Sequence, residues 1–206
     1  MSEELGKIEK PAAEEFATGR KLYFVPLILS PQEPPADLEE KLKKYWGEVE
    51  SHITNLEIKL GSVNKVYHEL VPIGSEEGAK AIEELNIGSY HIIKARLDKK
   101  AELQPIDDIE LLTEFMDWGK CLASGLQNQK VIVSVYESYI EVQKRRNSHI
   151  EKQIDETLKD NETGILLMRE GHQVQFPSDI HVFYVAPPSL DEIKRWLRKE
   201  PAPPNQ

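Results

Sequence analysis

The sequence has 206 residues, enough for one full hydrophobic core, which predicts a single domain over residues 21–199 between tails at residues 1–20 and 200–206. Hydrophobic residues make up 39% of the chain and charged residues 30%, and the net charge of −10 argues against a nucleic-acid partner, because phosphate binding needs an excess of lysine and arginine. The single cysteine, Cys121, excludes an internal disulfide framework, and its apolar helical context predicts a buried, unreactive thiol.

The two ends of the sequence are polar. Residues 1–20 are rich in glutamate and show little periodicity, which predicts a flexible acidic tail, and residues 200–206 form a Pro-rich tail. No stretch approaches the ~18 apolar residues of a membrane span, and residues 1–10 lack the hydrophobic region of a signal peptide. We therefore expect no membrane association and a cytoplasmic location.

The first third predicts a strand, a long helix and a second strand. Residues 21–29 are nearly all apolar, as in a strand covered on both faces, although Pro26 indicates an edge position or a bulge near the strand end. Apolar residues then recur every three or four positions between residues 38 and 56, which predicts a helix, and residues 63–71 resume an extended pattern. This order is typical of a right-handed βαβ unit, so we expect the first two strands to form a parallel pair.

The middle of the chain predicts two helices and one strand. A short helix is expected from Ser75, and residues 90–97 favour a third strand. Residues 106–122 are strongly helical, with apolar residues on one side and an acidic stripe on the other. The stripe either binds a hard cation or is simply a solvated acidic face. Its members are Asp107, Glu110, Glu114 and Asp117.

The last third completes an α/β pattern. Residues 128–159 predict one long helix because no glycine or proline interrupts them, although the β-branched residues 131–135 favour a short strand before a shorter helix. Strands are expected at residues 165–168 and 180–185, and Ser189 with Glu192 has the spacing of a capping box that begins a last helix. The predicted fold is α/β, with a mostly parallel central sheet and helices on both faces.

Polar side chains that follow parallel strands are the candidate site residues, because ligands bind where such strands end. Glu69, after the second strand, predicts a metal ligand or general base, or else an ordinary salt bridge. Its neighbour His68 points to the opposite face and is expected to pack under a helix. His172, after the strand at residues 165–168, predicts a metal ligand or general acid, or a hydrogen-bonding residue of its own loop.

Further candidates lie on the neighbouring elements. His181 and Asp179 flank the next strand, from which they are expected to approach His172. Arg145 and Arg146 lie on the long helix, where either one pairs with the glutamate or with an anionic ligand, or else both belong to a solvent-exposed basic turn.

Several well-known catalytic motifs are absent from the sequence. It contains no Gly-x-x-x-x-Gly-Lys-Ser/Thr loop and no Gly-x-Gly-x-x-Gly, which argues against the phosphate-cradling classes. It also contains no Gly-x-Ser-x-Gly elbow and no His-Glu-x-x-His, which argues against serine hydrolases and zincin-type proteases.

The order of these features resembles the TraB and Tiki group of α/β proteins, to which the haem-uptake ChaN and erythromycin-esterase folds are similar. In that group a strand ending in Glu-Leu, an arginine that opens the last long helix and a late Gly-x-x-His meet at the sheet edge, and some members are divalent-metal-dependent peptidases. The matching positions are Glu69, Arg146 and His172. Members with proposed activity carry Gly-x-x-His after the first strand, whereas this chain has Leu27-Ile28-Leu29-Ser30. The resemblance therefore implies a degenerate, non-catalytic copy of the fold.

Two functions follow as hypotheses. The first is a non-catalytic binding or scaffolding protein on a TraB/Tiki-like fold, with a protein or a small molecule as partner. The second is a hydrolase of a peptide or a small ester or amide. It would hold a divalent metal with Glu69, His172 and His181, and would bind the oxygen of the scissile group with Arg146. The second hypothesis requires Glu69 and His172 to be neighbours in one crevice.

Overall fold

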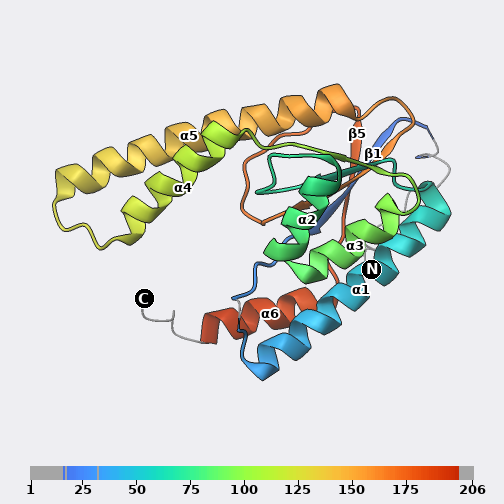
Figure 1. Ribbon diagram of the computed structural model, residues 1–206, viewed down its shortest axis with the longest axis horizontal. Helices are drawn as coiled ribbons and strands as arrows, with labels where there is room; N and C mark the ends of the chain where they lie inside the picture. The colour runs from blue at the N-terminus through green and yellow to red at the C-terminus, as the bar shows by residue number, and fades with distance from the viewer. Residues whose placement is uncertain (1–15, 17, 32, 200–206) are drawn as a thin grey trace, which may run out of the picture.

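The computed structural model describes residues 16, 18–31 and 33–199, and it has helices on both sides of a central sheet (Figure 1). The strands are β1 (Arg20–Pro26), β2 (Lys65–His68), β3 (Glu102–Gln104), β4 (Thr163–Met168) and β5 (Ile180–Tyr184). The helices are α1 (Ala36–Leu60), α2 (Ser75–Leu85), α3 (Ile87–Leu97), α4 (Ile109–Ala123), α5 (Gln129–Thr157) and α6 (Pro188–Lys199). The two predicted tails lie almost entirely outside the described residues.

The strand order is β3-β2-β4-β1-β5, and all four pairings are parallel, which confirms the predicted α/β fold. The expected pairing of the first two strands is wrong, because β4 lies between them: Ile165 has Tyr23 on one side and Val66 on the other. Pro26 is the last residue of β1, which is an interior strand. The expected edge position is therefore wrong, and the alternative of a bulge is wrong as well, because the register of β1 with β4 runs unbroken from Lys21 to Pro26.

Side chains of the sheet alternate between two hydrophobic layers. Tyr23 and Val25 pack in a layer with residues of α1, α2, α3 and α6, whereas Leu22 and Phe24 pack with residues of α5. All six residues of β4 are buried, which explains why the sequence of this strand is apolar without alternation.

The segment 90–97, expected to be a strand, is part of helix α3. Asn86 caps this helix, since its side chain accepts a hydrogen bond of 2.9 Å from the Ser89 N–H. Ile92 and Ile93 are both buried, in the hydrophobic layer that also contains residues of α1, β1 and β4. The third strand is β3, only three residues long, which is too short to produce a periodic pattern.

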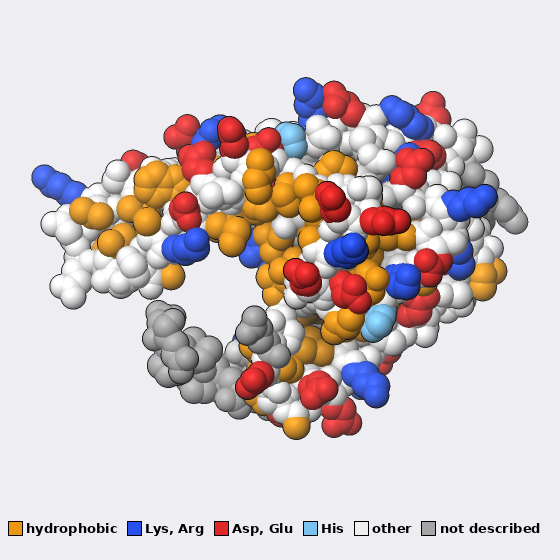
Figure 2. Space-filling model, viewed as in Figure 1, with side chains coloured by type: hydrophobic (Ala, Val, Ile, Leu, Met, Phe, Trp, Pro, Cys, Tyr) orange, Lys and Arg blue, Asp and Glu red, His pale blue; other side chains and the backbone are white. Residues whose placement is uncertain are grey.

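Helices α4 and α5 form a hairpin whose tip extends beyond the sheet (Figure 1). Helix α5 confirms the long helix predicted over residues 128–159. Because the hairpin tip is not covered, Cys121 is exposed, and the expectation of a buried thiol is wrong. The hairpin also leaves apolar side chains at the surface (Figure 2), among them Met116 and Tyr136. No helix in the described part of the chain is both long and apolar enough to cross a membrane.

The last helix begins at Pro188, one residue earlier than expected. The Ser189 N–H and hydroxyl donate to Glu48 Oε2 at 3.3 and 2.6 Å, so this serine binds α1 rather than forming the predicted capping box with Glu192. The bond joins α6 to α1 on the same face of the sheet.

Helix α2 approaches its neighbours closely at a glycine, which yields a first prediction. A Cβ atom at Gly78 would lie 2.3 Å from the Ile73 carbonyl oxygen and 2.9 Å from Leu103 Cδ2. We expect Gly78→Ala to lower the free energy of unfolding by about 1–3 kcal/mol, because the backbone must shift to make room. Urea denaturation measures this change. The control is Gly47→Ala in α1, where nothing lies within 4 Å of the new methyl group, and a gain of about 0.5–1 kcal/mol is expected.

Candidate functional site

Three of the predicted site residues, Glu69, Arg146 and His172, lie near the carboxyl edge of the sheet. The chain segments that follow neighbouring strands diverge at this edge. After β1 and β2 the chain continues into helices on one face, whereas residues 169–179, after β4, contribute Val174 and Phe176 to the opposite layer. Such a change of direction between adjacent parallel strands is the usual place for a ligand in an α/β sheet. Glu69 follows β2 and His172 follows β4 at this point.

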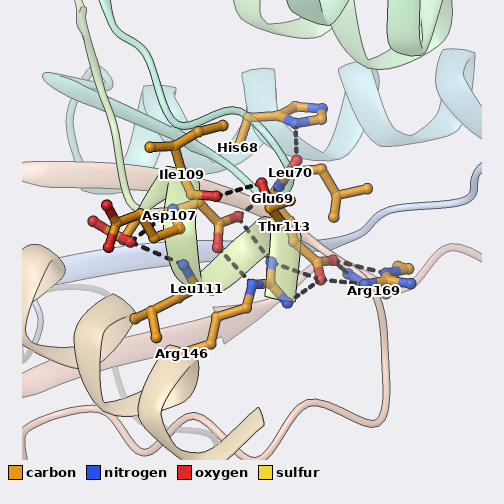
Figure 3. A network of polar contacts seen from close by, with 11 residues as sticks. His68, Glu69, Leu70, Asp107, Ile109, Leu111, Thr113, Arg146 and Arg169 are labelled. Atoms are coloured by element: carbon orange, nitrogen blue, oxygen red, sulfur yellow. Dashed lines mark hydrogen bonds and ion pairs between the residues drawn. The ribbon is translucent and has the colours of Figure 1, made fainter. Parts of the chain in front are cut away.

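Arg146 of α5 lies at the centre of a buried charge network (Figure 3). Its Nη1 and Nη2 atoms donate to Glu69 Oε1, both at 3.2 Å, and its Nε and Nη2 atoms donate to the two Asp107 oxygens at 2.5 and 2.8 Å. The guanidinium also lies 5.1 Å from the centre of the Phe115 ring. Burial alone would lower the pKa of Arg146, but the hydrogen bonds and charges of the two carboxylates raise it. The expected pairing of Arg146 with Glu69 is confirmed, whereas its neighbour Arg145 binds Glu114 at the surface.

Arg169, the first residue after β4, completes the network (Figure 3). Its backbone N–H and its Nε donate to Glu69 Oε2 at 2.8 and 3.1 Å, and its Nη2 donates to Glu69 Oε1 at 2.7 Å. Burial pushes the pKa of Glu69 upward, but the bonds from Arg169 and the charge of Arg146 hold it below its ordinary value. Glu69 is thus an ionised carboxylate that accepts five hydrogen bonds. In this state it is a weak base, and both of its oxygens are already occupied.

Sequence reasoning missed two members of this network. Helical spacing places Asp107 in the acidic stripe of a helix, but α4 begins only at Ile109 after its N-cap Asp108, and Asp107 is buried. Its Oδ2 also accepts a bond of 2.7 Å from the Leu70 N–H. Arg169 directly follows β4, so its place after a strand is the same signal that identifies Glu69.

His68 packs on the opposite side of the sheet from Glu69, as expected (Figure 3). Its Nδ1 donates to the Glu69 carbonyl oxygen at 2.7 Å, and its Nε2 lies 3.0 Å from the Ser89 hydroxyl of α3. Burial lowers the pKa of His68 to about 4, against the opposing effects of the Glu69 carbonyl and the nearby carboxylates. The ring is therefore neutral at physiological pH.

His172 forms its hydrogen bond within its own loop. Its Nδ1 accepts a bond of 3.2 Å from the Val174 N–H, and its ring lies 4.9 Å from that of Phe24 and 6.1 Å from that of Phe176. Burial lowers the pKa of His172, an effect that the charge of Glu69 opposes. The hydrogen bond matches the loop interpretation of this residue, and its role as a metal ligand or general acid stays a prediction.

His181 lies near the amino end of β5, opposite Lys21 at the start of β1, and therefore at the other edge of the sheet from Glu69. Its ring lies 5.2 Å from that of Phe16, and Asp179 binds Arg20 at 2.7 Å. The expected approach of His181 and Asp179 to His172 is therefore wrong, because β5 begins at the edge where β4 also begins. Within residues 16, 18–31 and 33–199, no three His, Cys, Asp or Glu side chains are grouped so that they could hold a metal ion.

A groove of about 930 Å³ lies between α1, the loop after β1 and the turn that joins α2 to α3. Leu42, Trp46 and Ile92 provide apolar lining, and Gly47 leaves the surface of α1 open beside them. Figure 2 shows apolar surface bordered by acidic side chains on the face of the molecule that carries α2 and α3. The volume falls in the range of ordinary ligand sites, roughly 300–1,000 Å³.

The chain has no significant match among protein-family models, curated protein sequences or solved structures.

Proposed function

We propose that this chain is a non-catalytic binding protein of the cytoplasm, built on a degenerate TraB/Tiki-like scaffold, and that its ligand occupies the groove beside Trp46. The state of Glu69 carries the non-catalytic part of the proposal. A general base or metal ligand needs a free lone pair, and the Glu69 carboxylate already receives five hydrogen bonds from Arg146 and Arg169. We assign this network the role of holding α5 and the loop after β4 against β2.

The groove supports the binding part of the proposal. It combines apolar lining with polar groups around its opening, the composition that is usual for ligand sites. Asn86 joins the loop after β1 to the start of α3, two sides of the groove. Its side chain donates to the Ile28 carbonyl oxygen at 2.7 Å and also caps α3. The groove is therefore a preformed surface whose walls are fixed by the fold.

A metal and esterase assay tests the non-catalytic part. The purified chain is dialysed against Zn²⁺ or Mn²⁺ and its metal content is measured beside that of His172→Ala, followed by hydrolysis of a chromogenic ester by both proteins. We expect no stoichiometric metal and equal background hydrolysis. Metal bound at one equivalent, lost in His172→Ala together with the hydrolysis, would establish the hydrolase instead.

Nile red, a neutral dye that fluoresces in apolar sites, tests the groove. We expect the folded chain to bind the dye, and Gly47→Leu to bind it several-fold more weakly because the new side chain fills the space above α1. The dye also reports other apolar surfaces, so Met116→Lys on the α4–α5 hairpin is the matched control. If only this control reduced binding, the groove would not be the site.

A further inference from the structure

We infer that the occupant of the groove is a basic amphipathic helix of a partner protein, with apolar residues on one face and lysine or arginine beside them. This inference rests on the proposed binding function and adds the chemistry of the partner. Four observations support it: the charge of the rim, the aromatic wall, the open glycine and the shape of the site.

The rim of the groove is acidic and its charges are largely unneutralised. Five glutamates line it against one lysine, Lys43, and of these glutamates only Glu50 has an ion-pair partner, Arg96. The others form no ion pair within the described part of the chain. They are Glu33, Glu39, Glu83 and Glu84. A cationic ligand is therefore complementary to the rim, whereas an acidic one is repelled.

The interior of the groove is apolar and its aromatic wall is fixed. Gly88 of α3 lies directly against Trp46, since a Cβ atom at this glycine would come within 2.1 Å of the indole nitrogen. Leu85 and Ile87 are also partly exposed at the same wall, at 37% and 55% of their surface. Trp46 is only half-buried, so part of its indole is available for contact with a ligand. The apolar side chains add a hydrophobic term that a purely charged ligand does not use.

Gly47 indicates close approach of the occupant. This residue lies inside α1, where glycine costs about 1 kcal/mol relative to alanine. Many helical glycines are required by a neighbouring element, as Gly78 and Gly88 are, but nothing in the chain lies within 4 Å of a Cβ at Gly47. The open space above Gly47 belongs to the groove. Because glycine has no side chain, the backbone of α1 is accessible there, and a partner could approach it closely.

The shape of the site favours a helix over a small polycation. The groove runs between helical segments of α1 and α3, and binding in such a groove typically uses apolar residues spaced three and four apart on the ligand. A polyamine would use the glutamates but would leave Trp46, Leu85 and Ile87 without apolar contacts. The net charge of −10 also favours the approach of a cationic partner from a distance.

Fluorescence anisotropy with a labelled peptide tests the inference. The peptide has about 16 residues, with leucines at the i, i+3, i+4 and i+7 positions of a helix and lysines elsewhere. We expect micromolar binding at physiological salt. A second peptide with glutamate at every lysine position should not bind. The double variant Glu83→Lys/Glu84→Lys should weaken binding of the basic peptide about tenfold or more.

Matched variants separate local charge from overall charge. Glu137→Lys/Glu141→Lys makes the same change in net charge on exposed positions of α5, and it should leave the affinity nearly unchanged. Gly47→Leu should weaken binding about tenfold while urea denaturation shows that the fold is retained. Equal weakening by both double variants would mean non-specific attraction and would overturn the inference.

Two further outcomes separate this inference from the function on which it rests. If Nile red binds in a Gly47→Leu-sensitive manner but the basic peptide does not bind, the groove is a site and the partner class is wrong. If spermine displaces the peptide and a leucine-free lysine peptide binds equally well, the site binds simple polycations. The inference of an amphipathic helix is then wrong. If the groove binds none of these probes, the proposed binding function fails as well.

Discussion

Replacement of Arg146 by methionine should lower the free energy of unfolding by about 3–5 kcal/mol, the usual cost of removing one partner from a buried ion pair. Arg146, Glu69 and Asp107 expose at most 3% of their side chains, so water cannot replace the lost hydrogen bonds. Glu69 retains Arg169 as a partner, but Asp107 keeps only the Leu70 N–H. Urea denaturation at neutral pH, followed by circular dichroism, measures the change.

Two controls make this prediction specific. Arg145→Met removes the adjacent positive charge, whose ion pair with Glu114 is exposed, and it should cost less than about 1 kcal/mol. The triple variant Arg146→Met/Glu69→Gln/Asp107→Asn also removes the orphaned charges, so its loss should be smaller than that of Arg146→Met alone. Equal losses for Arg145→Met and Arg146→Met would show that the network does not stabilise the fold.

Acidification should destabilise the protein mainly between pH 6.5 and pH 4 because of His68. Burial lowers the pKa of this histidine to about 4 in the folded chain, whereas the unfolded value is about 6.5. The unfolded chain therefore takes up the proton first. The contribution of the neutral His68 to the free energy of unfolding is complete above pH 6.5 and is lost as the pH falls through this window. Its full size is about 3 kcal/mol, of which about 2 kcal/mol should be lost by pH 5.

Urea denaturation at pH 7 and at pH 5 measures this loss. His68→Asn keeps a donor for the Glu69 carbonyl oxygen but has no group that titrates in this range, so the variant should be less stable at pH 7 and should lose much less stability on acidification. His172 contributes in the same direction, because burial also lowers its pKa. A His68→Asn variant with the same pH dependence as the parent would rule out His68 as the cause.

The sequence predicts well those elements whose burial pattern is written directly in the spacing of their apolar residues. β4 is apolar without alternation because it is buried on both faces, and α5 has an uninterrupted helical spacing through Ile150 and Ile154. The β-branched residues of segment 90–97 favour a strand, whereas the cap at Asn86 and the burial of Ile92 and Ile93 in the layer shared with α1 produce a helix. Local propensity was outweighed there by tertiary contacts.

The candidate site could be predicted only in part. Glu69 and Arg146 were identified because a strand end and a long helix converge, but their partner Asp107 lies before α4, where helical periodicity does not apply. The order of the strands was not predictable either, because β4 enters between β1 and β2 from a distant part of the sequence. The groove beside Trp46 likewise joins the loop after β1 to the turn after α2, two segments that no local pattern connects.

The interior place of β1 also determines when the sheet can form. During synthesis β1 leaves the ribosome long before its two neighbours, β4 and β5, and β2 likewise leaves before its neighbour β4. Until then the nascent chain has only the β2–β3 pair and an unpaired β1, with open strand edges and an incomplete core. Such distant pairings slow folding and favour aggregation, so we expect the growing chain to depend on chaperones until β4 has emerged.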